Sequence, residues 1–230
     1  MWQPTEEQIN NSQMMDYMQL VNQKFGLSLK KYSQLYDWSI EKAEDFWGSF
    51  WEYSQIIHHS PYSQVVDDLG KMPGAKWFDG ATLNFTENLL CHRDDKIAIL
   101  FQGEDGTQSS LTYKELHDQV SRLARSMREM GIVKNDRVAG FMPNIPETII
   151  AMLATASIGA IWSSCSPDFG IKGVLDRFEQ IEPKLIFAAD GYLYNGRQID
   201  CLSKVKEILV NLSSIYKTVI IPFAENADLS

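Results

Sequence analysis

The sequence has few cysteines, and they follow neither a metal-site pattern nor a disulfide framework. Its three cysteines are widely spaced and include no Cys-x-x-Cys pair, so neither a zinc site nor a disulfide-stapled fold is indicated. The adjacent His58 and His59 lack a further ligand at metal-binding spacing, and no metal site is predicted. A reducing compartment is the simplest location for such a chain, and we expect a cytosolic protein.

Positive charge and long apolar runs are also scarce. The chain carries 21 lysines and arginines against 30 acidic residues, a net charge of -9. Binding to nucleic acid depends on cationic side chains at the phosphates, so this balance argues against a nucleic-acid partner. It still allows a small anion, for which one local arginine suffices. No apolar run reaches the roughly 18 residues of a membrane span, and the N-terminus lacks the basic and apolar regions of a signal peptide.

The first 62 residues are rich in aromatic and polar residues and show no strand-like alternation. Methionines at helical spacing predict a helix that ends at Gly26, and a second helix is predicted from residue 32 or 39 to residue 57. Trp47 and Trp51 are four residues apart, which gives the second helix an aromatic face. We expect this face to pack the segment onto the main body; a ligand-stacking surface is the alternative. Residues 65–80 are predicted as a loop.

Strands and helices alternate in the rest of the chain. Alternation of this kind predicts a parallel sheet with helices on both faces. The fold class is therefore α/β: a helical, aromatic-rich N-terminal extension (residues 1–92), then the first part of a doubly wound, largely parallel sheet (residues 93–230). The predicted strands are residues 96–101, 109–112, 137–142, 158–164, 184–188 and 216–221, and the predicted helices are residues 112–130, 147–158, 172–182 and 201–211.

Two loops follow buried strands and are the expected ligand-binding segments. Residues 157–170 contain a strand and a turn rich in hydroxyls and glycine, and residues 189–200 form the second loop. In an open α/β sheet, ligands bind beyond the carboxyl ends of the strands. We therefore expect the two loops to share one edge of one sheet.

Several segments, in this order and spacing, resemble the AMP-forming acyl-CoA synthetase family of adenylate-forming enzymes, and most closely its members that act on acetoacetate. No single segment is specific, but together they cover about residues 35 to 222. The matching segments are Leu35-Tyr36-Asp37-Trp38-Ser39, Asp45-Phe46-Trp47, Trp77-Phe78, Leu83-Asn84, Glu87-Asn88-Leu89-Leu90, Asp136-Arg137-Val138, Pro143-Asn144, residues 156–164, Ser166-Pro167-Asp168-Phe169-Gly170, Gly173-Val174-Leu175-Asp176-Arg177-Phe178, residues 183–187 and Tyr194-Asn195-Gly196-Arg197.

The resemblance implies a two-step ligase and the adenylate-forming large domain. ATP and acetoacetate would give an acyl-adenylate and pyrophosphate, and the thiol of coenzyme A would then displace AMP; the product would carry ketone-body carbon into lipid synthesis. The family's phosphate loop, magnesium-binding acid and adenine pocket lie downstream of the matched segments. No glycine-rich loop ending in lysine occurs here, so no catalytic and no metal-binding residue is assigned, and this segment alone is expected to be inactive.

One site of the family can be carried over, the contact with CoA. A family turn of the form Arg-x-Gly-Arg helps to hold the phosphate-bearing end of CoA, and Tyr194-Asn195-Gly196-Arg197 stands in its place, with tyrosine replacing the first arginine. A guanidinium offers forked donors to a phosphate, and glycine lets the backbone turn beside it; a solvated surface arginine is the alternative. For the turn at residues 166–170, we expect Ser166 or Asp168 to cap the helix that follows. The alternative is that Phe169 and Gly170 form a wall on the CoA side.

Two alternatives to the acetoacetate-specific ligase stay open. One keeps the mechanism but replaces the acid by acetate, propionate or another short-chain acid. The other is a truncated, non-catalytic binding or regulatory protein of the same fold. Because the chain ends soon after the strand at residues 216–221, we expect it to be the N-terminal part of a longer polypeptide, whose remaining part would complete the active site.

Overall fold

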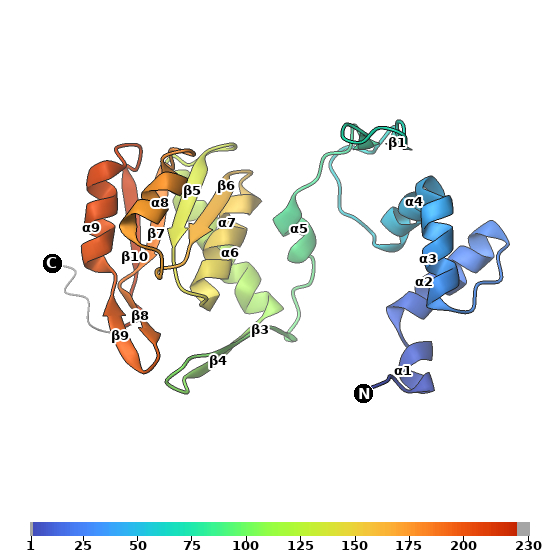
Figure 1. Cartoon of the computed structure of the whole chain (residues 1–230), viewed down its shortest axis with the longest axis horizontal. Coiled ribbons are helices and arrows are strands. Elements are labelled where there is room, and N and C mark those ends of the chain that lie inside the picture. Colours follow the sequence, from blue (N-terminus) through green and yellow to red (C-terminus); the bar gives the residue numbers. More distant parts are fainter. Residues whose placement is uncertain (1, 225–230) are drawn as a thin grey trace. The chain divides into compact units, whose positions relative to one another are not determined.

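The structure is a computed structural model, and it describes residues 2–224. The chain forms two compact units, Met1–Leu83 and Asn84–Ser230, drawn in Figure 1. Residues 225–230, on which the expectation about the end of the chain rests, lie outside the described residues. Each unit is described by itself.

The first unit begins with helices whose caps the sequence makes recognisable. The predicted stop at Gly26 is confirmed, because Gly26 ends the second helix in the left-handed conformation with φ 67°. The single helix predicted up to residue 57 is wrong: Lys42, with φ -122° and ψ 50°, separates two helices. The helices are α1 (Glu6–Asn10), α2 (Gln13–Phe25), α3 (Tyr32–Glu41) and α4 (Ala43–Tyr53).

Aromatic side chains of α4 pack within the first unit. The predicted loop at residues 65–80 is instead a small antiparallel ribbon of β1 (Gln64–Val66) and β2 (Trp77–Asp79). Trp51 stacks on Phe78 with ring centroids 4.6 Å apart, and Trp47 meets Trp77 edge-on at 6.1 Å. The ribbon was missed because each strand has only three residues, too few for alternation to be visible.

The second unit is built on the predicted parallel sheet. Its strands run in the order β10-β7-β5-β6, and every neighbouring pair is parallel. The connection from β5 to β6 leaves on one face, and the connection from β6 to β7 returns over the other. The strands are β5 (Arg137–Phe141), β6 (Ile161–Cys165), β7 (Leu185–Ala189) and β10 (Lys217–Ile221).

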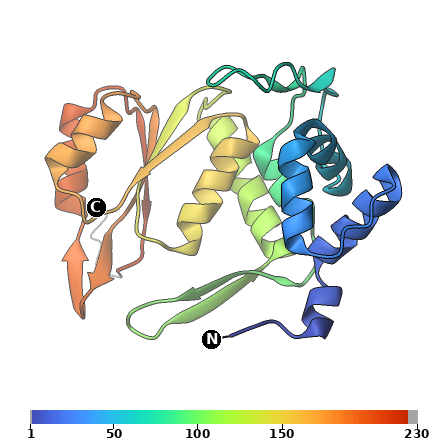
Figure 2. The same ribbon diagram turned by 45° about the vertical axis from the view of Figure 1, so that its right-hand side comes forward.

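Helices cover both faces of this sheet, as Figures 1 and 2 show. The central strand β7 is buried along its whole length because its alternate side chains enter two separate cores. Leu185 and Phe187 pack with α6 and α7, whereas Ile186 and Ala188 pack with α8 and α9. The α/β fold class is thus confirmed. The helices of this unit are α5 (Phe85–Leu89), α6 (Tyr113–Glu129), α7 (Pro146–Ser157), α8 (Ile171–Phe178) and α9 (Leu202–Asn211).

Two antiparallel hairpins complete the second unit. The strands predicted at residues 96–101 and 109–112 are confirmed, and they pair as an antiparallel hairpin of β3 (Ile97–Gln102) and β4 (Gln108–Thr112). The helix predicted over residues 112–130 is confirmed as α6, which begins with a capping box: the Thr112 hydroxyl accepts from the Glu115 N–H, and the Glu115 carboxylate accepts from the Thr112 N–H. The second hairpin, β8 (Gly191–Tyr194) with β9 (Arg197–Asp200), follows β7 and belongs to the candidate site.

An ion pair braces the turn that leads into β5. Asp136 is buried, with 6% of its surface exposed, and its carboxylate accepts from Lys184 Nζ at 2.7 Å and from the Val133 N–H at 2.9 Å. Burial by itself raises the pKa of Asp136, but the hydrogen bonds from Lys184 and Val133 outweigh it, and the pKa lies below its ordinary value. Folding therefore stabilises the ionised form of the Asp136 carboxyl relative to its protonated form.

This pair predicts an acid dependence of stability. A pKa lowered by folding contributes stability that is complete above the unfolded pKa of about 4 and is lost as the pH falls through the folded value. Asp136→Asn is expected to reduce the loss of unfolding free energy below about pH 4. Urea unfolding at several pH values below and above about pH 4 measures how steeply the free energy of unfolding depends on pH. Asp176→Asn, at an exposed position of α8, is the matched control; equal slopes for the two variants would contradict the prediction.

Candidate functional site

The two predicted binding segments leave the same edge of the sheet. Since β6 and β7 are both parallel to β5, which lies between them, their carboxyl ends point the same way. The turn at residues 166–170 follows β6, and the β8–β9 hairpin follows β7. The connection that leaves β5 runs to β6 on one side, whereas the connection that leaves β7 runs to β10 on the other side. The carboxyl ends of the neighbouring strands β5 and β7 are therefore the topological switch point, the place where ligands bind in open α/β sheets.

The turn after β6 is held by its own side chains. Ser166 Oγ donates to Asp168 Oδ2 at 2.8 Å, and the Phe169 N–H donates to the Ser166 carbonyl at 3.1 Å. Hydrogen bonds from Tyr192 and Ser166 lower the pKa of the Asp168 carboxyl. The carboxylate thus stays ionised and keeps accepting from both hydroxyls.

The expected cap of α8 is wrong. The residue at the cap position is Gly170, which makes no side-chain cap hydrogen bond. Ser166 and Asp168 lie too early in the chain and bond to each other instead. Ser166 and Asp168 could cap a helix by their chemistry, but they stabilise a turn instead because their side chains hydrogen-bond to groups within the turn.

The segment predicted as a loop at residues 189–200 is a tight hairpin. Tyr194 pairs with Arg197 across a two-residue turn, in which Asn195 and Gly196 have φ 51° and 69°. Positive φ at both positions is the requirement of a type I′ turn, for which Asn-Gly is the preferred sequence. The dipeptide was therefore a sequence signal for the hairpin that the prediction overlooked.

The turn after β6 is connected to the β7–α9 segment by side chains. Lys204 Nζ, on α9, donates to the Pro167 carbonyl at 2.9 Å. Tyr192, on β8, is buried and interacts with Asp168; burial and this carboxylate raise the pKa of Tyr192 to about 12. The base of the hairpin and the turn at residues 166–170 thus share polar contacts, while the tip of the hairpin takes no part in them.

The side chains proposed to meet a ligand are exposed. Tyr194 has 58% of its surface exposed and Phe169 has 41%, and Asn195, Gly196, Arg197 and Gly170 are exposed as well. Within residues 2–224, no hydrogen bond or ion pair engages the Arg197 guanidinium. A guanidinium without such a partner, beside a turn whose backbone is accessible, can donate hydrogen bonds to an anionic oxygen such as that of a phosphate.

One structurally important residue, Asp190, was missed by the sequence analysis. It directly follows β7, has 4% of its surface exposed, and its Oδ1 accepts from the backbone N–H groups of Phe223 and Ala224, both at 2.8 Å. Its Oδ2 is buried without a hydrogen-bond partner among the described residues. Asp190 therefore ties the chain leaving β10 to the base of the hairpin. Nothing in the sequence around it distinguishes it from a solvated loop acid.

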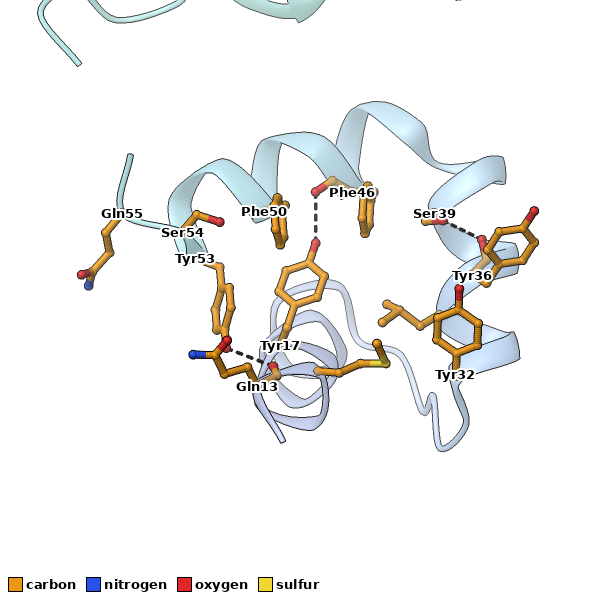
Figure 3. A pocket seen from close by; sticks show the side chains of 12 residues that line it. Gln13, Tyr17, Tyr32, Tyr36, Ser39, Phe46, Phe50, Tyr53, Ser54 and Gln55 are labelled. Atoms are coloured by element: carbon orange, nitrogen blue, oxygen red, sulfur yellow. Dashed lines mark hydrogen bonds between the residues drawn. The ribbon is translucent and has the colours of Figure 1, made fainter. Parts of the chain in front are cut away.

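The first unit contains a hollow between α2, α3 and α4 (Figure 3). Its cavity volume is about 730 Å³. The hydroxyls of Tyr17 and Tyr53 are already bonded to the carbonyls of Phe46 and Gln13, both at 3.0 Å. Every lining residue is uncharged, so the lining of this hollow offers no cationic side chain to an anionic ligand. It is lined by Gln13, Met14, Tyr17, Tyr32, Leu35, Tyr36, Ser39, Phe46, Phe50, Tyr53, Ser54 and Gln55.

Two searches of the described residues give negative results. Within residues 2–224, no three His, Cys, Asp or Glu side chains are grouped so that they could hold a metal ion. Over the same residues, no helix has the length and apolarity required to cross a membrane.

Comparison with known proteins gives matches to both parts of the chain. The family profile described as AMP-binding enzyme matches residues 85–229, and the profile described as acetyl-coenzyme A synthetase N-terminus matches residues 32–89. Acetoacetyl-coenzyme A synthetase of Rhizobium meliloti is 46% identical over 97% of this chain, and acetoacetyl-CoA synthetase of Macaca fascicularis is 42% identical over all of it.

A solved structure is similar to the whole described fold. Acetoacetyl-CoA synthetase from Streptomyces lividans superposes with a TM-score of 0.91 at 36% identity and covers 98% of this chain. The chain spans only about a third of these relatives: 34% of the Rhizobium protein, 35% of the macaque protein and 35% of the Streptomyces chain.

Proposed function

Because this chain belongs to the AMP-binding enzyme family, we propose that it is the N-terminal part of an acetoacetate-CoA ligase that forms AMP. The whole enzyme would join acetoacetate to ATP as an acyl-adenylate, release pyrophosphate, and transfer the acyl group to the thiol of CoA. The observation that carries this proposal is the similarity of nearly the entire chain, helical extension included, to proteins named acetoacetyl-CoA synthetase.

The part of the reaction assigned to this chain is the binding of CoA. Arg197 would hold a phosphate of CoA at the tip of the β8–β9 hairpin, with Asn195 and Gly196 supplying the turn beside it. Tyr194 would stack on adenine or cover the loop. Phe169 and Gly170 would form a wall of the same site. The shared sheet edge and the exposed, unengaged guanidinium support this assignment.

The remaining groups of the reaction are placed outside this chain. ATP and Mg²⁺ would be held by residues of the rest of the polypeptide, which would also carry every catalytic residue. In support, the sequence has no glycine-rich loop ending in lysine. A cytosolic location and a role in directing ketone-body carbon into lipid synthesis complete the proposal; the three free thiols suit a reducing compartment.

The proposal is tested by assaying the whole enzyme for AMP formation with each candidate acid. We expect AMP formation that requires both acetoacetate and CoA, and no activity from residues 1–230 alone. A strong preference for acetate or propionate would favour the short-chain acyl-CoA synthetase instead. If the polypeptide ended at Ser230 in the cell and formed no AMP with any acid, the non-catalytic alternative would replace the ligase.

A further inference from the structure

Phe169 is an exposed aromatic ring whose position is nevertheless held by a specific contact. The guanidinium of Arg177 lies over the ring, with Cζ 4.5 Å from the ring centroid, and 41% of the surface of Phe169 remains exposed. Arg177 projects from α8, whereas Phe169 belongs to the turn that precedes this helix. An exposed phenyl ring without such a contact would sample several rotamers.

The guanidinium is itself fixed on the helix. Arg177 Nη1 donates to the Gly173 carbonyl at 2.6 Å, so the same group that stacks on the ring is anchored one turn earlier on α8. A planar guanidinium can stack and donate in its plane at the same time, whereas a lysine ammonium is a point donor that cannot do both. A hypothetical Cβ on Gly173 would lie 3.5 Å from Arg177 Nη1 and 3.6 Å from the Phe169 ring, which shows how closely the three residues are packed.

The rest of the turn is fixed from the other side. Lys204 holds the Pro167 carbonyl, and Pro167 is buried. The backbone that carries Phe169 is therefore anchored independently of Arg177, and what Arg177 adds is the orientation of the ring.

We propose that Arg177 is a positioning residue that holds Phe169 as an apolar wall against CoA. This inference rests on the proposed function, and it assigns a role to the Gly173 and Arg177 segment, which the CoA assignment left without one. Stacking of the guanidinium leaves the remaining ring surface in one orientation, ready to contact the adenine or pantetheine part of CoA. Arg177 acts through Phe169 and makes no phosphate contact of its own.

The test compares Arg177→Gln with wild type in the whole enzyme. We expect the KM for CoA to rise about 2- to 5-fold, the size of an exposed cation–π contact, while ATP–pyrophosphate exchange driven by acetoacetate stays unchanged. Arg177→Lys should recover only part of the loss. Lys172→Gln, which removes a charge from an exposed position of the same helix, is the matched control and should leave the KM for CoA unchanged.

Two further measurements separate positioning from direct contact and from a purely structural role. In a Phe169→Leu background, Arg177→Gln should have no further effect on the KM for CoA; an undiminished effect would overturn the proposal. With dephospho-CoA as substrate the effect of Arg177→Gln should persist, and its disappearance would assign Arg177 to the phosphate instead. If wild type fails in pyrophosphate exchange, the proposed function fails; if wild type exchanges normally and the KM for CoA does not respond to Arg177→Gln, only this inference fails.

Discussion

Arg197→Ala is expected to raise the KM for CoA about tenfold to a hundredfold in the whole enzyme, with the KM for ATP unchanged. A charge-assisted hydrogen bond to a phosphate contributes about 1.5–3 kcal/mol, and about 1.4 kcal/mol corresponds to a factor of ten. Arg197 has no competing partner among the described residues, so its replacement would remove the proposed contact with CoA and would leave no buried group unpaired. Steady-state kinetics with CoA and ATP varied in turn measures the effect.

Two variants make this experiment specific. Arg197→Lys retains a point charge and should lie between wild type and alanine, because a lysine cannot form the forked contact. Arg125→Ala is the control, since Arg125 is exposed and pairs with Glu129 on the surface of α6, and surface pairs contribute about 0–1 kcal/mol. An unchanged KM for CoA in Arg197→Ala would remove Arg197 from the site.

Gly191→Ala is expected to destabilise the second unit by about 1–3 kcal/mol or more, the usual cost of forcing extra atoms into packed structure. A Cβ on Gly191 would lie 2.7 Å from the Ile199 carbonyl oxygen and 2.9 Å from Ala224 Cβ. The nearer atom is backbone of the paired strand β9, which cannot move aside without breaking the hairpin register. Urea unfolding of the 230-residue chain measures the change.

Gly170→Ala is the matched control for this change. A Cβ on Gly170 would have no heavy atom within 4 Å, and its φ of -66° suits any residue. The change in its stability should therefore stay within about 1 kcal/mol, because alanine restricts the unfolded chain more than glycine does but is less favourable than glycine at the N-cap that Gly170 occupies. Equal stabilities for Gly191→Ala and Gly170→Ala would show that the hairpin tolerates the displacement.

The elements predicted well are those whose signal is local. The capping box of α6 lies entirely within Thr112 and Glu115, and the stop of α2 depends on the backbone freedom of Gly26. The buried strand β7 was recognisable as a continuous apolar run, which is typical of a parallel sheet covered on both faces. The α/β class follows from these local signals because alternating strands and helices have few other ways to bury their apolar faces.

The elements predicted wrongly are those whose local structure depends on partners far along the chain or on competing hydrogen-bond partners. Ser166 and Asp168 have the chemistry of helix caps, but they bond to each other and Asp168 also meets Tyr192, which is far along the chain. The β1–β2 ribbon exists because the aromatic face of α4 packs on it, and strands of three residues carry no pattern of their own.

By itself, the sequence determined the α/β class and the family resemblance, because both depend on side-chain types at short, regular spacing. Only the tertiary structure decided that Asp190 ties the chain leaving β10 to the hairpin, that Arg177 stacks on Phe169, and that the turn after β6 is anchored by Lys204. These contacts join residues from different elements, and their energies depend on distance and burial, which no local pattern encodes.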